Sequence, residues 1–162
     1  MTLTESSVVP GLERVRERLE TRARRISGRV GGDLADFVGR PGKMLRARFC
    51  LHLAAGLGTP VEKAEAAARA MELVHNASLL HDDVVDDAEL RRGQSTPNKV
   101  FGTTVGLLLG DLGFTQALEE ALEISPAALE RLVAAVREMT IGELQEEFLK
   151  GSSDVSLEAY LG

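Results

Sequence analysis

Residues 61–87 read VEKAEAAARAMELVHNASLLHDDVVDD, and this stretch decides the fold. It is rich in alanine and has no internal glycine or proline, so it predicts one long helix from about Val61 through Asp86. Most of the remaining chain also has helical periodicity, and no segment has the alternating pattern of a strand. We therefore expect an all-α protein, an antiparallel helix bundle with short connections.

Four other helices are expected. They are predicted over residues 12–26, 43–57, 99–124 and 126–150. A turn is expected at residues 39–42, and a further helix begins at residue 156 and runs for under two turns. Gly102, Gly106 and Gly110 lie on one face of the 99–124 helix, where missing side chains favour close packing against another backbone.

Composition limits the classes of protein. The 162 residues, 44% of them hydrophobic and 27% charged, suit one domain with its own core. A net charge of -6 argues against a general nucleic-acid binder. The single cysteine, Cys50, lies in an apolar run and is expected to fill the core of a protein in a reducing compartment. Without a signal peptide or an apolar run of roughly 20 residues, the chain is expected to be cytoplasmic and not an integral membrane protein.

Four carboxylates cluster near the end of the long helix, on Asp82, Asp83, Asp86 and Asp87. Asp82 and Asp86 share one face, where like charges repel, and the negative end of the helix dipole adds to that cost. Divalent cations relieve both penalties, and an all-oxygen set of ligands suits Mg²⁺. The cluster therefore favours a Mg²⁺ site over a merely solvated helix end.

Basic residues flank the acidic segment on both sides. Lys43 and Arg46 lie three apart at a predicted helix start, where free backbone N–H groups also favour anions. Arg91 and Arg92 follow the acidic segment, and guanidinium groups suit bidentate contacts with phosphate. Together with the carboxylates, these residues indicate Mg²⁺-assisted binding of diphosphates.

Residues 72–93, ELVHNASLLHDDVVDDAELRRG, resemble the first aspartate-rich region of the trans-isoprenyl (polyprenyl) diphosphate synthases. Residues 42–46, GKMLR, match an earlier glycine-lysine motif of that family in Lys43 and Arg46, although Pro41 and Met44 depart from its usual residues. Residues 101–111 and 142–145 also follow the family pattern. The resemblance therefore extends over almost the whole chain from about residue 12.

The resemblance implies a fold, an activity and a set of roles. The fold would be the first half of the isoprenoid synthase fold, and the reaction would condense isopentenyl diphosphate with an allylic prenyl diphosphate. Asp82 and Asp86 would coordinate Mg²⁺ on the allylic diphosphate, with Asp83 in support and Arg91 holding the same diphosphate. The diphosphate of isopentenyl diphosphate would be held by Lys43, Arg46, His75 and Arg92.

The family also suggests how product length is limited. Bulky residues four and five positions before the first aspartate help to close the elongation tunnel, and here these residues are Ser78 and Ala77. Their small side chains would leave the tunnel open. The expected product is a medium- or long-chain polyprenyl diphosphate.

The second aspartate-rich motif of the family does not occur in residues 1–162, which we interpret as a single partial domain. Three explanations stay open. The chain is a natural half whose partner subunit supplies the second motif, a fragment of a longer synthase, or a non-catalytic subunit that binds isoprenoid diphosphates or regulates a synthase. The intact first-half motifs favour the first explanation, in which catalysis needs both subunits.

A di-iron protein is a remote alternative. Glu72 and His75 have the Glu-x-x-His spacing of di-iron helix bundles, and residues 143–147 contain further glutamates. Such sites need a second Glu-x-x-His on another helix, which this sequence lacks.

Overall fold

The computed structural model describes residues 3–25, 43–151 and 156–157. Helices dominate these ranges, as expected, and they run in the order α1 (Leu3–Arg24), α3 (Leu45–Gly56), α4 (Val61–Val85), α5 (Pro97–Phe101), α6 (Thr103–Ile124) and α7 (Pro126–Leu149). The turn expected at residues 39–42 and most of the short helix after residue 156 lie outside the described residues.

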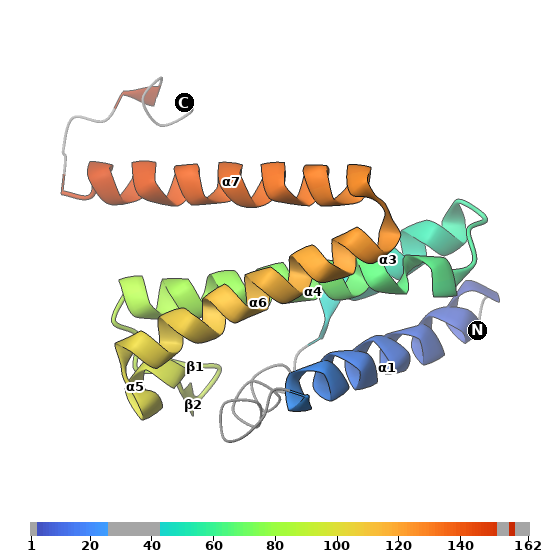
Figure 1. Ribbon diagram of the computed structural model, residues 1–162, viewed down its shortest axis with the longest axis horizontal. Coiled ribbons are helices and arrows are strands. Elements are labelled where there is room, and N and C mark those ends of the chain that lie inside the picture. The colour runs from blue at the N-terminus through green and yellow to red at the C-terminus, as the bar shows by residue number, and fades with distance from the viewer. Residues whose placement is uncertain (1–2, 26–42, 152–155, 158–162) are drawn as a thin grey trace.

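Helices α4 and α6 form the centre of the molecule (Figure 1). Helix α1 crosses one side and contacts both α3 and α4, whereas α7 lies on the opposite side and packs mainly against α6. A Cβ atom added to Gly110 of α6 would come within 2.4 Å of the His81 ring of α4. The expected close packing at this glycine is therefore confirmed.

The hydrophobic core joins α1, α3, α4 and α6. Its fully buried members include Val15 of α1, Leu51 of α3 and Leu73 of α4. Val8 is also buried, and this packing explains why α1 begins at Leu3, nine residues before the predicted start and despite Pro10. Cys50 is partly buried against the core as expected, and burial raises the pKa of its thiol.

Two further local predictions were wrong. The helix predicted over residues 99–124 is two helices, because Gly102 adopts a φ of 92° that ends α5 and precedes α6. The sequence also predicted no strands, but β1 (Leu90–Arg91) and β2 (Gln94–Ser95) form a short antiparallel hairpin. Two-residue strands are too short to produce an alternating pattern.

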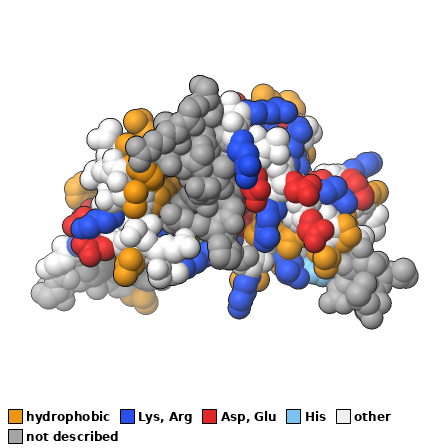
Figure 2. Space-filling model, turned by 90° about the horizontal axis from the view of Figure 1, so that it is seen from below, with side chains coloured by type: hydrophobic (Ala, Val, Ile, Leu, Met, Phe, Trp, Pro, Cys, Tyr) orange, Lys and Arg blue, Asp and Glu red, His pale blue; other side chains and the backbone are white. Residues whose placement is uncertain are grey.

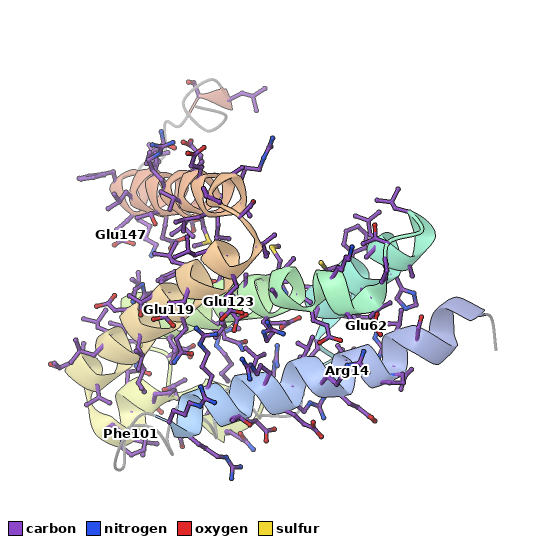
Figure 3. All side chains as sticks on the ribbon, turned by 45° about the vertical axis from the view of Figure 1, so that its right-hand side comes forward. Arg14, Glu62, Phe101, Glu119, Glu123 and Glu147 are labelled. Carbon is purple, nitrogen blue, oxygen red and sulfur yellow. The ribbon has the colours of Figure 1, made fainter. Side chains whose placement is uncertain are left out.

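The outer face of α1 carries charges of both signs. Figure 2 shows Lys and Arg side chains interspersed with Asp and Glu side chains on the side of the molecule where α1 lies. Some of these charges join helices: Arg14 of α1 donates to Glu65 of α4 at 2.8 Å and lies 3.4 Å from Glu62 (Figure 3). Within the described ranges, no helix is both long enough and apolar enough to cross a membrane.

Candidate diphosphate and metal site

The end of α4 sets the positions of the acidic residues. Asp86 caps the helix and Asp87 follows in the left-handed region, with a φ of 49°. The Ala88 N–H donates to the Asp83 carbonyl at 2.9 Å, and the Asp87 N–H donates to the Val84 carbonyl at 3.3 Å. This is the Schellman pattern of a helix C-terminus, with aspartate in the place usually taken by glycine. Asp87 therefore ends the helix.

The β1–β2 hairpin brings an arginine back to this helix end. Its turn residues, Arg92 and Gly93, both have positive φ values of 53° and 77°, as a type I′ turn requires. On β1, Arg91 Nε donates to Asp83 Oδ1 at 2.6 Å. Asp83 is fully buried, and its second oxygen, Oδ2, has no hydrogen-bond partner in the described part of the chain.

The other two aspartates are more accessible. Asp82 is partly buried, and burial is the main cause that raises the pKa of its carboxyl group. Arg91 opposes this shift, whereas the neighbouring charges of Asp86 and Asp83 add to it. Asp86 is exposed. Both Asp82 and Asp86 are therefore open to a cation, which would also relieve the repulsion between them.

Helix α7 brings further charges to the same place. Lys150 Nζ lies 3.8 Å from Asp86 Oδ1 and 2.5 Å from Glu147 Oε2. Figure 3 shows Glu147 on the side of α7 that faces the rest of the molecule. The pKa of Glu143 is raised, first by burial and then by the negative charge of Asp82. The far end of α7 thus adds both a cation and carboxylates to the acidic segment.

This arrangement fits a hard divalent cation. Within the described ranges, no group of three or more His, Cys, Asp or Glu side chains could by itself hold a metal ion. Mg²⁺ commonly uses only one or two carboxylates and completes its coordination with water and substrate phosphates. The repulsion between the carboxylates and the position of the Lys150 ammonium near Asp86 both indicate that this helix end attracts cations.

Arg91 links the acidic segment to the basic residues, since it binds Asp83 and its charge also acts on His75. Lys43 and Arg46 are exposed at the start of α3, and Arg92 is exposed at the hairpin turn. His75 is partly buried on α4, and its pKa is lowered to about 4, first by burial and then by the positive charges of Arg46, Arg92 and Arg91. Its imidazole is therefore neutral at pH 7, where it can donate only one N–H. The structure brings His75 and these three arginines into one basic group.

The start of α3 is not an open anion site, because Glu72 of α4 occupies part of it. The Ala47 N–H, which lies in the first turn of α3, donates to Glu72 Oε1 at 2.9 Å. Glu72 is buried, with 6% of its surface exposed. One N–H group expected to bind phosphate is therefore already satisfied.

The two candidate chain-length residues lie on different parts of the α4 surface. Ala77 is buried against α6, where a Cβ atom added to Gly113 would lie 3.0 Å from the Ala77 Cβ. Ser78 is partly buried, and its hydroxyl donates to the His75 carbonyl at 3.0 Å.

Sequence reasoning missed three contributors to the site. The sequence suggests Glu72 only as a possible iron ligand, and it predicts neither the contact of Lys150 with Asp86 nor the hairpin turn at Arg92. The Arg92-Gly93 turn had a recognisable signal, since glycine favours positive φ. No local pattern predicts the contact of Lys150 with Asp86. The two residues are 64 positions apart in the sequence, and they meet only because α7 folds back along α6.

The structure is similar to those of solved prenyl diphosphate synthases. It matches a geranyltranstransferase from Thermotoga maritima with a TM-score of 0.83 and 30% identity, covering 94% of this chain and 59% of that one. It matches a geranylgeranyl pyrophosphate synthetase from the archaeon Geoglobus acetivorans with a TM-score of 0.80 and 27% identity, covering 99% and 53%. The fold is therefore that of the first half of an isoprenoid synthase.

The chain belongs to the polyprenyl synthetase family, whose family model matches residues 32–162. It is 34% identical over 157 residues to a geranylgeranyl diphosphate synthase of Mycobacterium tuberculosis, covering 93% of this chain and 44% of the relative. It is 36% identical over 152 residues to a heptaprenyl diphosphate synthase component 2 of Geobacillus stearothermophilus, covering 93% and 47%. The chain thus spans about half the length of these relatives.

Proposed function

We propose that this chain takes part in Mg²⁺-dependent prenyl transfer, in which isopentenyl diphosphate is condensed with an allylic prenyl diphosphate. One observation carries the proposal: the acidic end of α4 lies beside a group of basic residues from α3, α4 and the hairpin. Such a juxtaposition suits two diphosphates and a divalent cation. The names of the relatives support this class of reaction.

The acidic residues are proposed to bind the allylic substrate. Asp82 and Asp86 would hold Mg²⁺ against its diphosphate, and the metal would neutralise charge on the leaving group. Asp83 would act on the substrate only indirectly, through Arg91, because its carboxylate is buried and binds the Arg91 guanidinium. This contact would orient Arg91 toward the same diphosphate.

The basic residues are proposed to bind isopentenyl diphosphate through Lys43, Arg46, His75 and Arg92. The positive charges of Lys43, Arg46 and Arg92, together with an N–H donated by the neutral His75 ring, hold this diphosphate beside the first one, so that the two reacting carbon chains lie together. The allylic carbon–oxygen bond breaks, pyrophosphate leaves, and the double bond of isopentenyl diphosphate attacks the allylic cation. A proton is then lost from the new chain to the departing pyrophosphate.

A partner subunit that carries the second aspartate-rich motif is proposed to complete the pocket. In the described part of the chain, α7 has no buried residue, although it carries exposed apolar side chains such as Leu144 and Phe148. One relative is named as component 2 of its synthase, which fits an enzyme of more than one component. A fragment of a longer synthase would need the same second half in one chain. The cytoplasmic location stays a prediction from the sequence.

The test is to incubate the chain with Mg²⁺, isopentenyl diphosphate and farnesyl diphosphate, alone and with a candidate C-terminal-half subunit. We expect turnover only in the mixture. Asp82→Asn should reduce it at least about 100-fold, because a ligand to the metal is lost. Asp87→Asn is the matched control, since asparagine tolerates the left-handed conformation of this helix end and we assign Asp87 no ligand role.

Two results would decide against catalysis by the assigned residues. Full turnover by Asp82→Asn in the mixture would contradict the metal role. Tight binding of both diphosphates without turnover in any mixture would favour the alternative, a non-catalytic subunit that binds isoprenoid diphosphates or regulates a synthase.

Ala77 and Ser78 are proposed to leave the elongation tunnel open. Ala77→Phe should therefore shorten the product, as measured by chromatography of the dephosphorylated prenols. Because Ala77 packs against α6, this variant needs a check of its helical content by circular dichroism. Ser78→Phe is the matched variant at a less tightly packed position. Unchanged product length in both folded variants would contradict the proposal.

A further inference from the structure

Glu72 of α4 makes a hydrogen bond to the backbone at the start of α3. Its Oε1 accepts from the Ala47 N–H at 2.9 Å, in a contact that is buried on both sides. The two residues are 25 positions apart, so this bond depends on the packing of α3 against α4. Nothing in the roles assigned above uses this carboxylate.

Helix α3 has no cap of its own. Its N-cap residue, Met44, adopts the left-handed conformation with a φ of 42° and makes no side-chain hydrogen bond to the first turn. A methionine in this region is strained, and the first N–H groups of a helix need acceptors. Glu72 supplies an acceptor from another helix, and its negative charge also favours the positive end of the α3 dipole.

The Glu72 cap joins α3, whose start carries Lys43 and Arg46, to α4, which carries His75. Lys43 and Arg46 flank the start of α3, and His75 lies one turn after Glu72 on α4. A carboxylate that holds the first turn of α3 against α4 therefore sets the position of Lys43 and Arg46 relative to His75. The charge of Arg46 acts on His75, in agreement with this proximity.

We propose that Glu72 is a positioning residue for the diphosphate of isopentenyl diphosphate. The inference rests on the proposed function, because it takes the basic group to be the site of that diphosphate. Glu72 does not contact the substrate. It acts through the α3 backbone, by keeping the two sets of basic side chains at a spacing that one diphosphate can bridge.

The test measures binding of isopentenyl diphosphate to the chain by calorimetry, without Mg²⁺ so that the acidic site contributes little. Glu72→Gln keeps an acceptor oxygen of the same shape, and its affinity should stay within about threefold of wild type. Glu72→Leu removes the acceptor and should weaken binding about tenfold or more, as expected when positioning is lost. Glu72→Asp keeps the negative charge, but its shorter side chain moves the acceptor oxygen away from the Ala47 N–H. This variant should therefore also bind isopentenyl diphosphate more weakly than wild type.

A second readout separates positioning from general stability. Glu120→Gln changes a buried carboxylate away from the basic group and should lower stability without changing this affinity. In the mixture with a C-terminal-half subunit, Glu72→Asp should raise KM for isopentenyl diphosphate and leave KM for the allylic diphosphate unchanged.

The outcomes are distinguishable. If wild type binds and Glu72→Leu and Glu72→Asp bind equally well, the inference is wrong while the proposed site stands. If Glu72→Leu does not fold, Glu72→Asp is compared with Glu72→Gln: weaker binding by Glu72→Asp supports the inference, and equal binding contradicts it. If wild-type protein does not bind isopentenyl diphosphate, the assignment of the basic group fails, and the inference fails with it.

Discussion

Three of the four aspartates of the acidic segment, Asp82, Asp83 and Asp86, occupy three different environments. Asp83 is fully buried and bound to Arg91, Asp82 is partly buried, and Asp86 is exposed near Lys150. Identical side chains within five residues therefore differ in what they can do. Asp82 and Asp86 are accessible to a cation, whereas Asp83 can act only through the guanidinium that it holds.

His75 should make the stability of the protein depend on pH. Its pKa is about 4 in the folded chain and near 6.5 in the unfolded chain, so the unfolded chain binds more protons between these values. Stability is therefore lost as pH falls through this window. The full shift corresponds to about 3 kcal/mol, and solvent screening of the partly exposed ring reduces the expected loss to about 1 kcal/mol.

The measurement is the free energy of unfolding in urea at pH 7 and pH 4.5. Wild type should lose about 1 kcal/mol more than His75→Gln over this interval. Arg46→Gln should show an intermediate loss, because removing one positive charge raises the pKa of His75. Lys63→Gln serves as the control. Lys63 is an exposed residue of α4 and is not one of the charges that lower the pKa of His75. Equal pH dependence in wild type and His75→Gln would contradict the prediction.

At the scale of elements, a buried ion network ties three helices together. Glu120 of α6 is fully buried and accepts from Arg22 of α1 at 2.6 Å and from Arg69 of α4 at 2.7 Å. Glu119 and Glu123 of α6, both labelled in Figure 3, lie at the edge of this network. Arg22 thus joins α1 to α6 through an ion pair with a buried carboxylate.

Loss of the buried charge should destabilise the fold. Glu120→Gln leaves two guanidinium groups without their shared carboxylate and should lower the free energy of unfolding by about 2–4 kcal/mol. Glu119→Gln, at a side chain that is 61% exposed, should cost less than about 1 kcal/mol. Urea denaturation of the two variants measures both. Equal effects would mean that the network contributes no more than a surface ion pair.

At the scale of the whole molecule, α7 is the least enclosed long helix. It packs mainly against α6, and none of its residues is buried in the described structure. Leu144 is 55% exposed and Phe148 is 86% exposed. Exposed apolar side chains of this kind are typical of a surface that contacts another protein.

Charged substitutions on this face should block assembly without unfolding the chain. Leu144→Glu and Phe148→Glu should each weaken association with a C-terminal-half subunit about tenfold or more, because burying a carboxylate in an apolar interface is costly. Each should change the stability of the isolated chain by less than about 0.5 kcal/mol, since both positions are exposed.

Analytical ultracentrifugation of the mixture measures the association. Glu130→Lys is the matched control, because it changes a charge on an exposed position of α7 outside this pair. Undiminished association in both apolar-face variants would rule out this face as the interface.

Much of the architecture was predictable because the helices carry local signals. The boundaries of α4 and α7 agree with expectation to within a residue, and Ser125 accepts from the Ala128 N–H as an N-cap should. The break at Gly102 was missed because one glycine within an apolar run does not reveal its φ. The acidic and basic candidates were likewise visible as charge clusters whose repulsion serves no structural purpose.

The sequence by itself determined the helical class, the family resemblance and the identity of the candidate residues, because these depend on local pattern and residue type. Only the tertiary structure decided which groups meet. The bond from Glu72 to Ala47, the approach of Lys150 to Asp86 and the burial of Glu120 between two arginines all join residues at least 25 positions apart. Such contacts depend on how helices pack, and no local pattern encodes them.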